Sequence, residues 1–569
     1  MDGEIASSSF ERLVMSEIVQ RNDAVSLAER GEAANGEGVP GFGRASCWAA
    51  LVVLAAVFSI RFALLPARWF NPDEFEHVHA AWCVGKGMAP YRDFFEHHTP
   101  WFYYVLAPLV HGVGTDGGSR SAAGALVLAR WGSLVFAAGA LGALVWVGRL
   151  WAGMLAGLSA AALLATMPMF LEKTVEVRPD VPALMLWLAC LAWLARGIQP
   201  GGARVACRPG ATRAGQDAEL NAGPSGRTRA ETQDVAPTRF HTSFFIAGLC
   251  LGGAIMFTQK MLFTLPGLGV AGLAWACLGG RRGAARGSPA GRCTLAWRLA
   301  ALAWFAVGLF TPFLLTWGWF AAHGAGFAFI QNNFLLNARW KAAEAPQPFL
   351  QYILRDSWPV VALAAGGILL LWFNLLMRKS CDWLGLLFLL ALGGLLLGLL
   401  LIPVAMAQYY LMLLPLVALF AGRFLVFLAG LAPRAARWPC HYVAMVLLQL
   451  SPMSRALDTL NWRNEDQLRQ IDFVLAHSGP NEMVMDGWRG FGVFRPHAWY
   501  YYFLHPEVRG MLPPAELAAF LGQLESGNVK PKFVVMDNNL RALPERFNAF
   551  VKTHYEEGPG DIWIRKREP

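Results

Sequence analysis

Residues that could carry out chemistry are concentrated in one stretch, from Phe70 to His111. Its acids, histidines and cations are Asp73, Glu74, Glu76, Asp93, Glu96, His77, His79, His97, His98, His111, Lys86 and Arg92. A carboxylate in such a group can act as general base toward a hydroxyl or an amine. A neighbouring cation can stabilise a leaving group that departs as a phosphate anion. The simpler interpretation is a solvated connecting loop, because charged loop residues usually face water.

This polar stretch lies in a strongly apolar chain. Of the 569 residues, 55% are hydrophobic and only 15% are charged, and the mean hydropathy is +0.39. Soluble proteins carry about 25% charged residues, so the composition predicts an integral membrane protein. The net charge of +9 comes from loops between apolar segments, as in cytoplasmic loops that collect Arg and Lys. No basic stripe for nucleic acid is present. The nine cysteines are scattered singly and indicate no disulfide framework.

Apolar runs of bilayer length predict a mainly α, polytopic membrane protein with about eleven transmembrane helices. We place these helices within 46–452, near 46–65, 122–147, 150–170, 181–196, 243–257, 261–279, 299–320, 359–377, 383–402, 410–430 and 439–452. Basic loops alternate with loops of other composition. The positive-inside rule therefore predicts a disordered cytoplasmic tail at 1–45, an outer catalytic loop at 66–121 and a disordered cytoplasmic loop at 197–241.

The last segment, 453–569, is predicted to be a small soluble α/β domain on the outer face. Strands are expected at 482–488, 532–537 and 561–567, and helices at 468–478 and 513–526. Alternation of strands with helices is typical of an α/β domain.

Three polar groups fall on the predicted outer face. The first is the Asp73-Glu74 pair, the second is the EVRPD run from Glu176 to Asp180, and the third is the run from Glu96 to Pro100, joined by Lys260. Each has a structural alternative. The Arg178-Pro179-Asp180 run can be a helix start, and Lys260 can extend from a helix end toward water. The histidine spacing does not require a metal.

The order of these motifs resembles the GT-C class of membrane glycosyltransferases. It consists of an apolar span, a DE pair, the run GxxxYRDFFEHHTPWFYYVL, and RPD before a later span. More narrowly, it is similar to bacterial relatives of protein O-mannosyltransferases and lipid A aminoarabinose transferases. The resemblance extends to about Gly430 and is sharpest over 73–108. Weaker matches are GLCLGGAIMFTQK at 248–260 and QYYLMLLPLVALFAG at 408–422.

The resemblance implies a polyprenyl-phosphate-linked sugar as donor and transfer at the outer face of the membrane. Asp73 matches the catalytic base, Glu74 stands beside it, and Asp180 matches a second acidic site, so the resemblance implies these three as catalytic residues. In relatives, the position of the Glu96–Pro100 run commonly holds Lys-Pro-Pro, and the lysine is thought to contact the lipid phosphate. Here His98 stands at the position of that lysine. The candidates for the phosphate contact are therefore His97, His98, Arg92, Arg178 and Lys260, with Glu96 and Glu176 as further site residues.

We therefore expect a hexosyl- or pentosyltransferase of the bacterial inner membrane, with its C-terminal domain periplasmic or extracellular. The acceptor would be a glycolipid, a polysaccharide or a protein, and no nucleic acid or certain cofactor is expected. The alternatives are a transporter or flippase of a lipid-linked or anionic substrate, or a non-catalytic lipid-binding relative. The resemblance is the main reason to favour the enzyme, and the spans, which are mostly free of charge, with the polar residues in outer loops, agree with it.

Overall fold

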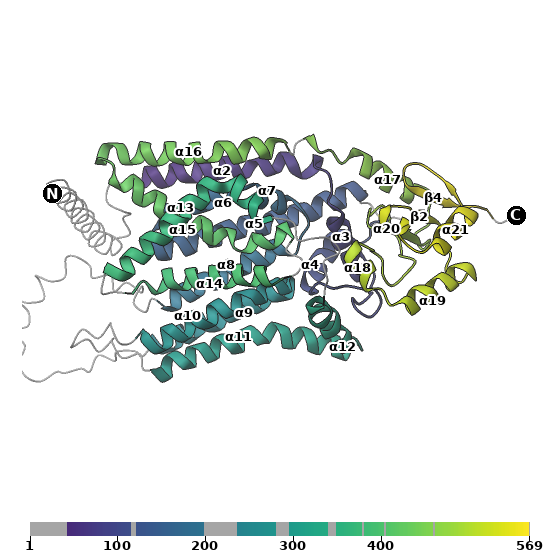
Figure 1. Ribbon diagram of the computed structural model, residues 1–569, viewed down its shortest axis with the longest axis horizontal. Helices are drawn as coiled ribbons and strands as arrows, with labels where there is room; N and C mark the ends of the chain where they lie inside the picture. Colours follow the sequence, from purple (N-terminus) through teal and green to yellow (C-terminus); the bar gives the residue numbers. More distant parts are fainter. Residues whose placement is uncertain are drawn as a thin grey trace, which may run out of the picture.

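The computed structural model of the chain describes residues 42–114, 121–198, 236–279, 295–339, 349–377, 381–402, 406–458 and 461–567. Most of the tail predicted at 1–45 and of the loop predicted at 197–241 lies outside the described residues. A long bundle of helices forms one part of the molecule, and a small sheet lies beyond one end of it (Figure 1).

The helices of the bundle are long enough and apolar enough to cross a membrane. Among the described residues, eight meet this criterion, and a bent pair adds a ninth if it counts as one span. The eight are α2 (Arg44–Ala67), α5 (Ala122–Ala152), α8 (Asp180–Ile198), η2 with α10 (Gln259–Phe263 and Thr264–Leu278), α11 (Leu295–Ala322), α13 (Phe349–Met377), α14 (Trp383–Leu401) and α15 (Leu414–Leu431). This arrangement confirms the predicted polytopic helical fold.

Three of the eleven predicted spans take another form. The span expected at 150–170 is the bent pair α6 (Met154–Thr166) and α7 (Pro168–Val175), with an angle of 73° between its parts. Pro168 begins the second part, since a proline lacks the N–H that would continue the first helix. The span expected at 243–257 is part of α9 (Ala236–Phe257), and the one at 439–452 lies within the amphipathic α16 (Arg434–Asp458).

Local sequence signals explain where several of these helices begin and how closely they pack. The Ser121 side chain accepts the backbone N–H of Gly124 at 3.1 Å at the start of α5, as N-cap residues do. Helices α9 and α11 approach closely at Gly248, where a Cβ atom would lie 2.1 Å from the carbonyl oxygen of Phe305. Small residues of this kind let helix backbones meet inside membranes.

Short helices fill the layer between the bundle and the sheet. They are α3 (Pro72–Gly85), α4 (Trp101–Val110), α12 (Gly326–Ile330), η4 (Gln331–Leu336) and η5 (Ala407–Met412). Helices α3 and α4 lie between the long helices and the C-terminal elements (Figure 1). The polar stretch from Phe70 to His111 is therefore enclosed by protein on both sides.

The C-terminal part has the predicted alternation of helices and strands. Its elements are α17 (Glu465–Ala476), β1 (Val484–Asp486), α18 (Pro506–Met511), α19 (Pro514–Glu525), β2 (Phe533–Val535), α20 (Asn538–Arg541), α21 (Glu545–His554), β3 (Tyr555–Glu557) and β4 (Ile562–Arg565). The sheet order is β1-β2-β4-β3, with β1 and β2 parallel and the other pairs antiparallel. The strands expected at 482–488, 532–537 and 561–567 are confirmed as β1, β2 and β4.

Candidate active site

The first turn of α3 carries Asp73 and Glu74, and its capping residues fix both. The Asn71 side chain accepts the backbone N–H of Asp73 at 3.1 Å, and Glu74 Oε1 accepts the N–H of Asn71 at 2.9 Å. This reciprocal pair is a capping box. Pro72 occupies the first helical position, where its missing N–H is not needed. The positive end of the helix dipole favours negative charge at this turn.

Glu74 is fully buried and paired with Arg130 of α5. Arg130 Nε and Nη2 donate to the two carboxylate oxygens of Glu74 at 2.8 and 2.7 Å. Glu74 Oε2 also accepts the backbone N–H of Val177 at 3.0 Å. Because both oxygens of Glu74 are engaged, this residue ties α3 to α5 and to the turn that leads into α8.

Asp73 contacts the second polar group through Arg178. Arg178 Nη2 lies 2.8 Å from Asp73 Oδ2, and the Asp73 side chain remains 21% exposed. Arg178 also pairs with Glu176, which lies 3.1 Å from Arg68 Nη1 and 3.2 Å from Lys173 Nζ. Burial raises the pKa of Glu176, but Lys173, Arg178 and Arg68 together outweigh it and hold that pKa well below its usual value. The buried Glu176 carboxylate is therefore ionised and holds Arg178 in place.

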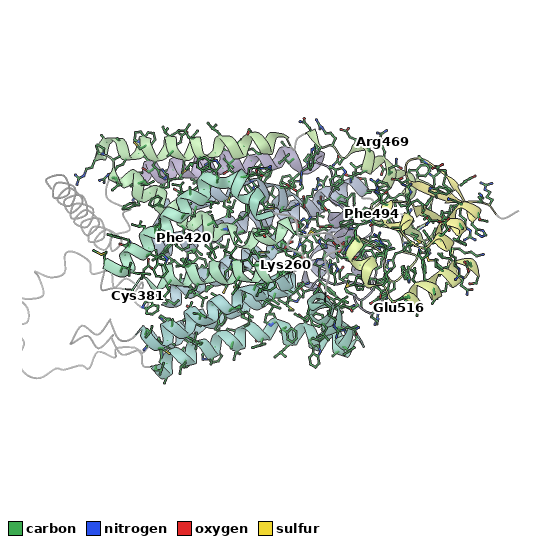
Figure 2. The ribbon with its side chains drawn as sticks, in the orientation of Figure 1. Lys260, Cys381, Phe420, Arg469, Phe494 and Glu516 are labelled. Atoms are coloured by element: carbon green, nitrogen blue, oxygen red, sulfur yellow. The ribbon has the colours of Figure 1, made fainter. Side chains whose placement is uncertain are left out.

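Asp180 begins α8 and binds Lys260. Lys260 Nζ donates to Asp180 Oδ1 at 3.0 Å and lies 4.1 Å from the centroid of the Tyr409 ring. Lys260 lies toward the end of the bundle that faces the sheet (Figure 2). Arg178 interacts electrostatically with both Asp73 and Asp180. Asp73, Arg178, Asp180 and Lys260, from three separate parts of the sequence, thus form one charged group, which we call the Asp73 group.

Glu96 organises the turn that holds the histidine pair. Its Oε1 accepts the backbone N–H groups of His97 and His98 at 2.9 and 3.0 Å and lies 3.0 Å from His98 Nδ1. Its Oε2 accepts from the Tyr502 hydroxyl at 3.2 Å. The Gln259 amide donates to the His97 carbonyl at 3.0 Å. This turn is therefore linked both to η2, which carries Lys260, and to the C-terminal part.

Three side chains of this turn, together with Glu76 of α3, could hold a divalent cation. Glu76, Glu96, His97 and His98 offer ligand atoms that lie within 4.8 Å of one another. Burial, followed by repulsion from Glu96 and Asp73, holds the pKa of Glu76 well above its usual value. Burial also lowers the pKa of His97 well below its usual value. A bound cation would favour the ionised carboxylate and the neutral imidazole that such ions require.

Arg92 is not part of either group. Its guanidinium donates to the adjacent Asp93 carboxylate at 2.8 and 2.7 Å, and its Nη1 donates to the His323 carbonyl at 3.4 Å. The Arg92 side chain is 46% exposed. Within the described part of the chain, its hydrogen bonds join it to these two residues and not to Asp73, Asp180 or Glu96.

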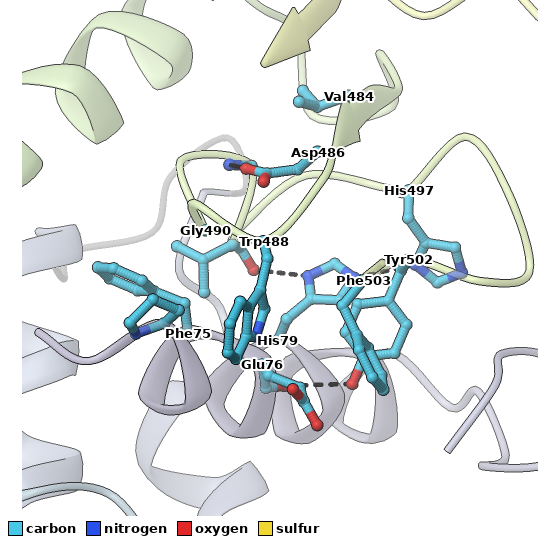
Figure 3. Close-up of a pocket in the computed structure, with 13 residues that line it drawn as sticks. Phe75, Glu76, His79, Val484, Asp486, Trp488, Gly490, His497, Tyr502 and Phe503 are labelled. Atoms are coloured by element: carbon cyan, nitrogen blue, oxygen red, sulfur yellow. Dashed lines mark hydrogen bonds between the residues drawn. The ribbon is translucent and has the colours of Figure 1, made fainter. Parts of the chain in front are cut away.

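The C-terminal part contributes residues that sequence reasoning did not assign to the site. A pocket lies between α3 and the segment 487–505, which joins β1 to α18 and which we call the 487–505 loop (Figure 3). Its lining residues are Pro72, Phe75, Glu76, His79, Val484, Asp486, Trp488, Gly490, Gly492, Val493, His497, Tyr502 and Phe503. The aromatic run at 499–503 could have indicated this contact, because aromatic side chains often cover a buried polar surface.

The basic partners of the buried acids were also missed. Arg130, Arg68 and Lys173 each neutralise a carboxylate at this junction. Arg130 had a usable signal, since a cation inside an apolar span is expensive unless it faces a partner within the protein. Which carboxylate it would meet depends on how the helices pack, and spacing along the chain does not reveal that.

Neither a protein-family model nor a curated protein matches the sequence. Solved structures do match. ArnT from Cupriavidus metallidurans, bound to undecaprenyl phosphate, aligns with a TM-score of 0.56 at 14% identity over 89% of this chain and 94% of that one. The oligosaccharyltransferase AglB from Archaeoglobus fulgidus, in complex with an inhibitory peptide and a dolichol-phosphate, aligns with a TM-score of 0.51 at 12% identity over 91% and 74%. This chain therefore has the GT-C fold of polytopic membrane glycosyltransferases.

Proposed function

We propose that this protein is a glycosyltransferase that moves a sugar from a polyprenyl-phosphate donor to an acceptor at the outer face of a bacterial inner membrane. The observation that carries the proposal is the state of Asp73. This carboxylate is oriented by Arg178 and partly exposed, whereas the adjacent Glu74 is fully buried by its pairing with Arg130. The similar fold of ArnT, whose structure contains undecaprenyl phosphate, supports a lipid-phosphate donor.

In the proposed reaction, Asp73 accepts the proton of the acceptor hydroxyl or amine. The acceptor atom forms a bond to the anomeric carbon as the bond from that carbon to the phosphate oxygen breaks. The polyprenyl phosphate departs with the electron pair. A single displacement inverts the configuration at the anomeric carbon. General-base assistance of this kind contributes a factor of about 10²–10⁴ to the rate.

Lys260 and Arg178 are the favoured contacts for the departing phosphate. Arg178 lies 2.8 Å from Asp73, and Lys260, which is paired with Asp180, also interacts electrostatically with Asp73. His97 is a weaker candidate, because burial, followed by the neighbouring His98, His505, His77 and Lys260, holds its pKa well below the usual value. Arg92 is engaged by Asp93 away from this group. Asp180 would then hold Lys260 in position until the donor binds.

The distribution of basic loops supports the placement of this site at the outer face, with the N-terminus in the cytoplasm. The acceptor would approach from that side, where the C-terminal part borders the Asp73 group. A glycolipid, a polysaccharide or a protein fits this arrangement equally well. The proposal therefore specifies the donor chemistry and leaves the acceptor class to the experiment.

The test uses mass spectrometry of surface glycolipids and glycoproteins. It compares cells whose own gene is deleted with the same cells supplied with one of three versions of the gene. Wild type should restore a single missing sugar, and Asp73→Asn should fail to restore it at an equal protein level. Asp466→Asn is the matched control, because Asp466 also lies in the first turn of its helix, α17, and its side chain is 84% exposed. Full restoration by Asp73→Asn would exclude Asp73 as the base. An unchanged profile in cells lacking the gene would contradict the transferase itself.

A further inference from the structure

A second group of ligand-type side chains lies where α3 faces the 487–505 loop. His79 and Cys83 are one helical turn apart on α3, and His497 comes from the 487–505 loop. His79 Nε2 lies 2.9 Å from His497 Nδ1 and 3.5 Å from Cys83 Sγ. Cys83 Sγ lies 3.9 Å from His497 Nδ1. Three potential ligand atoms therefore converge on one point.

The backbone around this group orients both rings. His79 Nδ1 lies 2.9 Å from the carbonyl oxygen of Val493, and that oxygen accepts a ring N–H. The backbone of Asp93 lies within hydrogen-bonding reach of the His497 ring. With their outer nitrogens protonated, the two rings direct lone pairs toward each other and toward Cys83. Metal-binding histidines are typically held in this way by a backbone carbonyl.

From this geometry we propose that His79, Cys83 and His497 bind a zinc ion that joins α3 to the C-terminal part. Zinc prefers ligands such as two imidazoles and a thiolate, and a water molecule or a fourth protein ligand would complete the tetrahedron. Binding releases the thiol proton of Cys83 to solvent, and no oxidation or reduction is involved. This proposal does not depend on the proposed transferase activity.

The distances fit such a site with little movement. Zinc bonds of about 2.0–2.1 Å to nitrogen and about 2.3 Å to sulfur place tetrahedral ligand atoms about 3.3 Å apart for two nitrogens and about 3.6 Å apart for nitrogen and sulfur. The two sulfur-to-nitrogen distances are 3.5 and 3.9 Å. The imidazole nitrogens, at 2.9 Å, would separate by a few tenths of an ångström.

Aromatic side chains enclose the three ligands. The His79 ring lies 5.8 Å from Trp82 and 4.7 Å from Tyr502 between ring centroids, and the His497 ring lies 6.1 Å from Phe94. An apolar shell of this kind limits water access and strengthens the bond between a metal and its ligands. Because Asp73 lies in the first turn of the helix that carries His79 and Cys83, a metal here would also fix the orientation of the Asp73 group.

The neighbouring group of Glu76, Glu96, His97 and His98 contains no sulfur, which allows the two places to be separated by spectroscopy. We would purify the full chain in detergent through a tag that lacks histidine, strip it with a chelator, and titrate it with cobalt(II). A thiolate-to-cobalt charge-transfer band saturating at about one ion per chain is expected. The same protein purified without chelator should contain about one zinc by mass spectrometry.

Cys83→Ser should abolish the charge-transfer band, and His497→Gln should weaken cobalt binding by at least about tenfold. The matched controls, Cys250→Ser and the exposed His477→Gln, should bind as wild type does. If Cys83→Ser fails to fold, a variant that keeps Cys83 and replaces the other cysteines by alanine must retain the band. A wild-type protein without the band, or a band that survives in Cys83→Ser, would overturn the proposal.

Discussion

Replacing Arg130 by methionine should loosen the junction between the bundle and α3. Arg130 is fully buried and bidentate to Glu74. It also donates to the carbonyl oxygens of Leu65 at 2.9 Å, Arg68 at 2.8 Å and Trp69 at 3.0 Å, and its guanidinium lies 3.7 Å from the centroid of Phe70. Methionine keeps the apolar stem and removes every donor. The variant therefore leaves the buried Glu74 carboxylate without its cation, with only the backbone N–H groups of Asn71 and Val177 still donating to it.

The expected loss of stability follows from the buried negative charge that remains on Glu74. Removing one member of a buried ion pair costs about 3–5 kcal/mol, because the remaining charge stays desolvated. We expect the free energy of unfolding of Arg130→Met to fall by this amount. The double variant Glu74→Met/Arg130→Met removes both charges, so it should lose less than the sum of the two single variants. The coupling between the two sites should reach about 1–3 kcal/mol.

Unfolding of the purified protein by a denaturing detergent, followed by circular dichroism, measures these differences. Arg469→Met is the matched control, since Arg469 pairs with Asp466 at the surface and its side chain is 76% exposed. Such a pair contributes less than about 1 kcal/mol. If Arg130→Met unfolded at the same detergent fraction as wild type, or if the two single variants were additive, the Glu74–Arg130 pair would not be what secures α3.

Three further predictions concern the site and the part that covers it. Lys260→Met should lower transfer by a factor of about 10²–10³, as expected for loss of one group that stabilises developing charge, measured as product formed per protein in membranes. Burial raises the pKa of Asp486 to about 6. The protonated Asp486 therefore contributes its full stability below the ordinary pKa of about 3.9, and this contribution is lost as pH rises through about 6. The free energy of unfolding of wild type, measured against pH, should fall over this range relative to that of Asp486→Asn. Gly490 has a φ of +80° and its added Cβ would lie 2.2 Å from α3, so Gly490→Ala should lower both transfer and the unfolding temperature, whereas Gly510→Ala, with open space around it, should change neither.

The sequence predicted the membrane helices well because bilayer thickness imposes their length. The first span was expected at 46–65 and occupies Arg44–Ala67. Breaks within apolar runs were harder to predict. The bend at Pro168 was missed because α6 and α7 together have the length and apolar composition of one span. That bend leads directly into the run that contains Glu176 and Arg178.

The sequence predicted which residues of the candidate site lie on one face, but it did not predict which of them form ion pairs with one another. Asp73, Arg178, Asp180 and Lys260 were all candidates, and they do meet. Glu74 was predicted beside Asp73 as a catalytic residue, and both of its oxygens accept hydrogen bonds from Arg130 and from the backbone. Arg130 is 56 positions away along the chain. Ion pairing over such separations is set by helix packing, which periodicity and composition do not encode.

The composition changes near residue 452, between the predicted transmembrane part and the predicted C-terminal domain. We infer that the candidate site nevertheless extends across this boundary. Gln467 exchanges two hydrogen bonds with the backbone of Phe70, at 2.7 and 2.8 Å, just before Asp73. Tyr502 donates to Glu96, and Gly490 abuts Phe75. Each of these contacts replaces water around a buried polar or aromatic group. Since a buried carboxylate without its hydrogen bonds is costly, the stretch from Phe70 to His111 needs the C-terminal part to keep its shape.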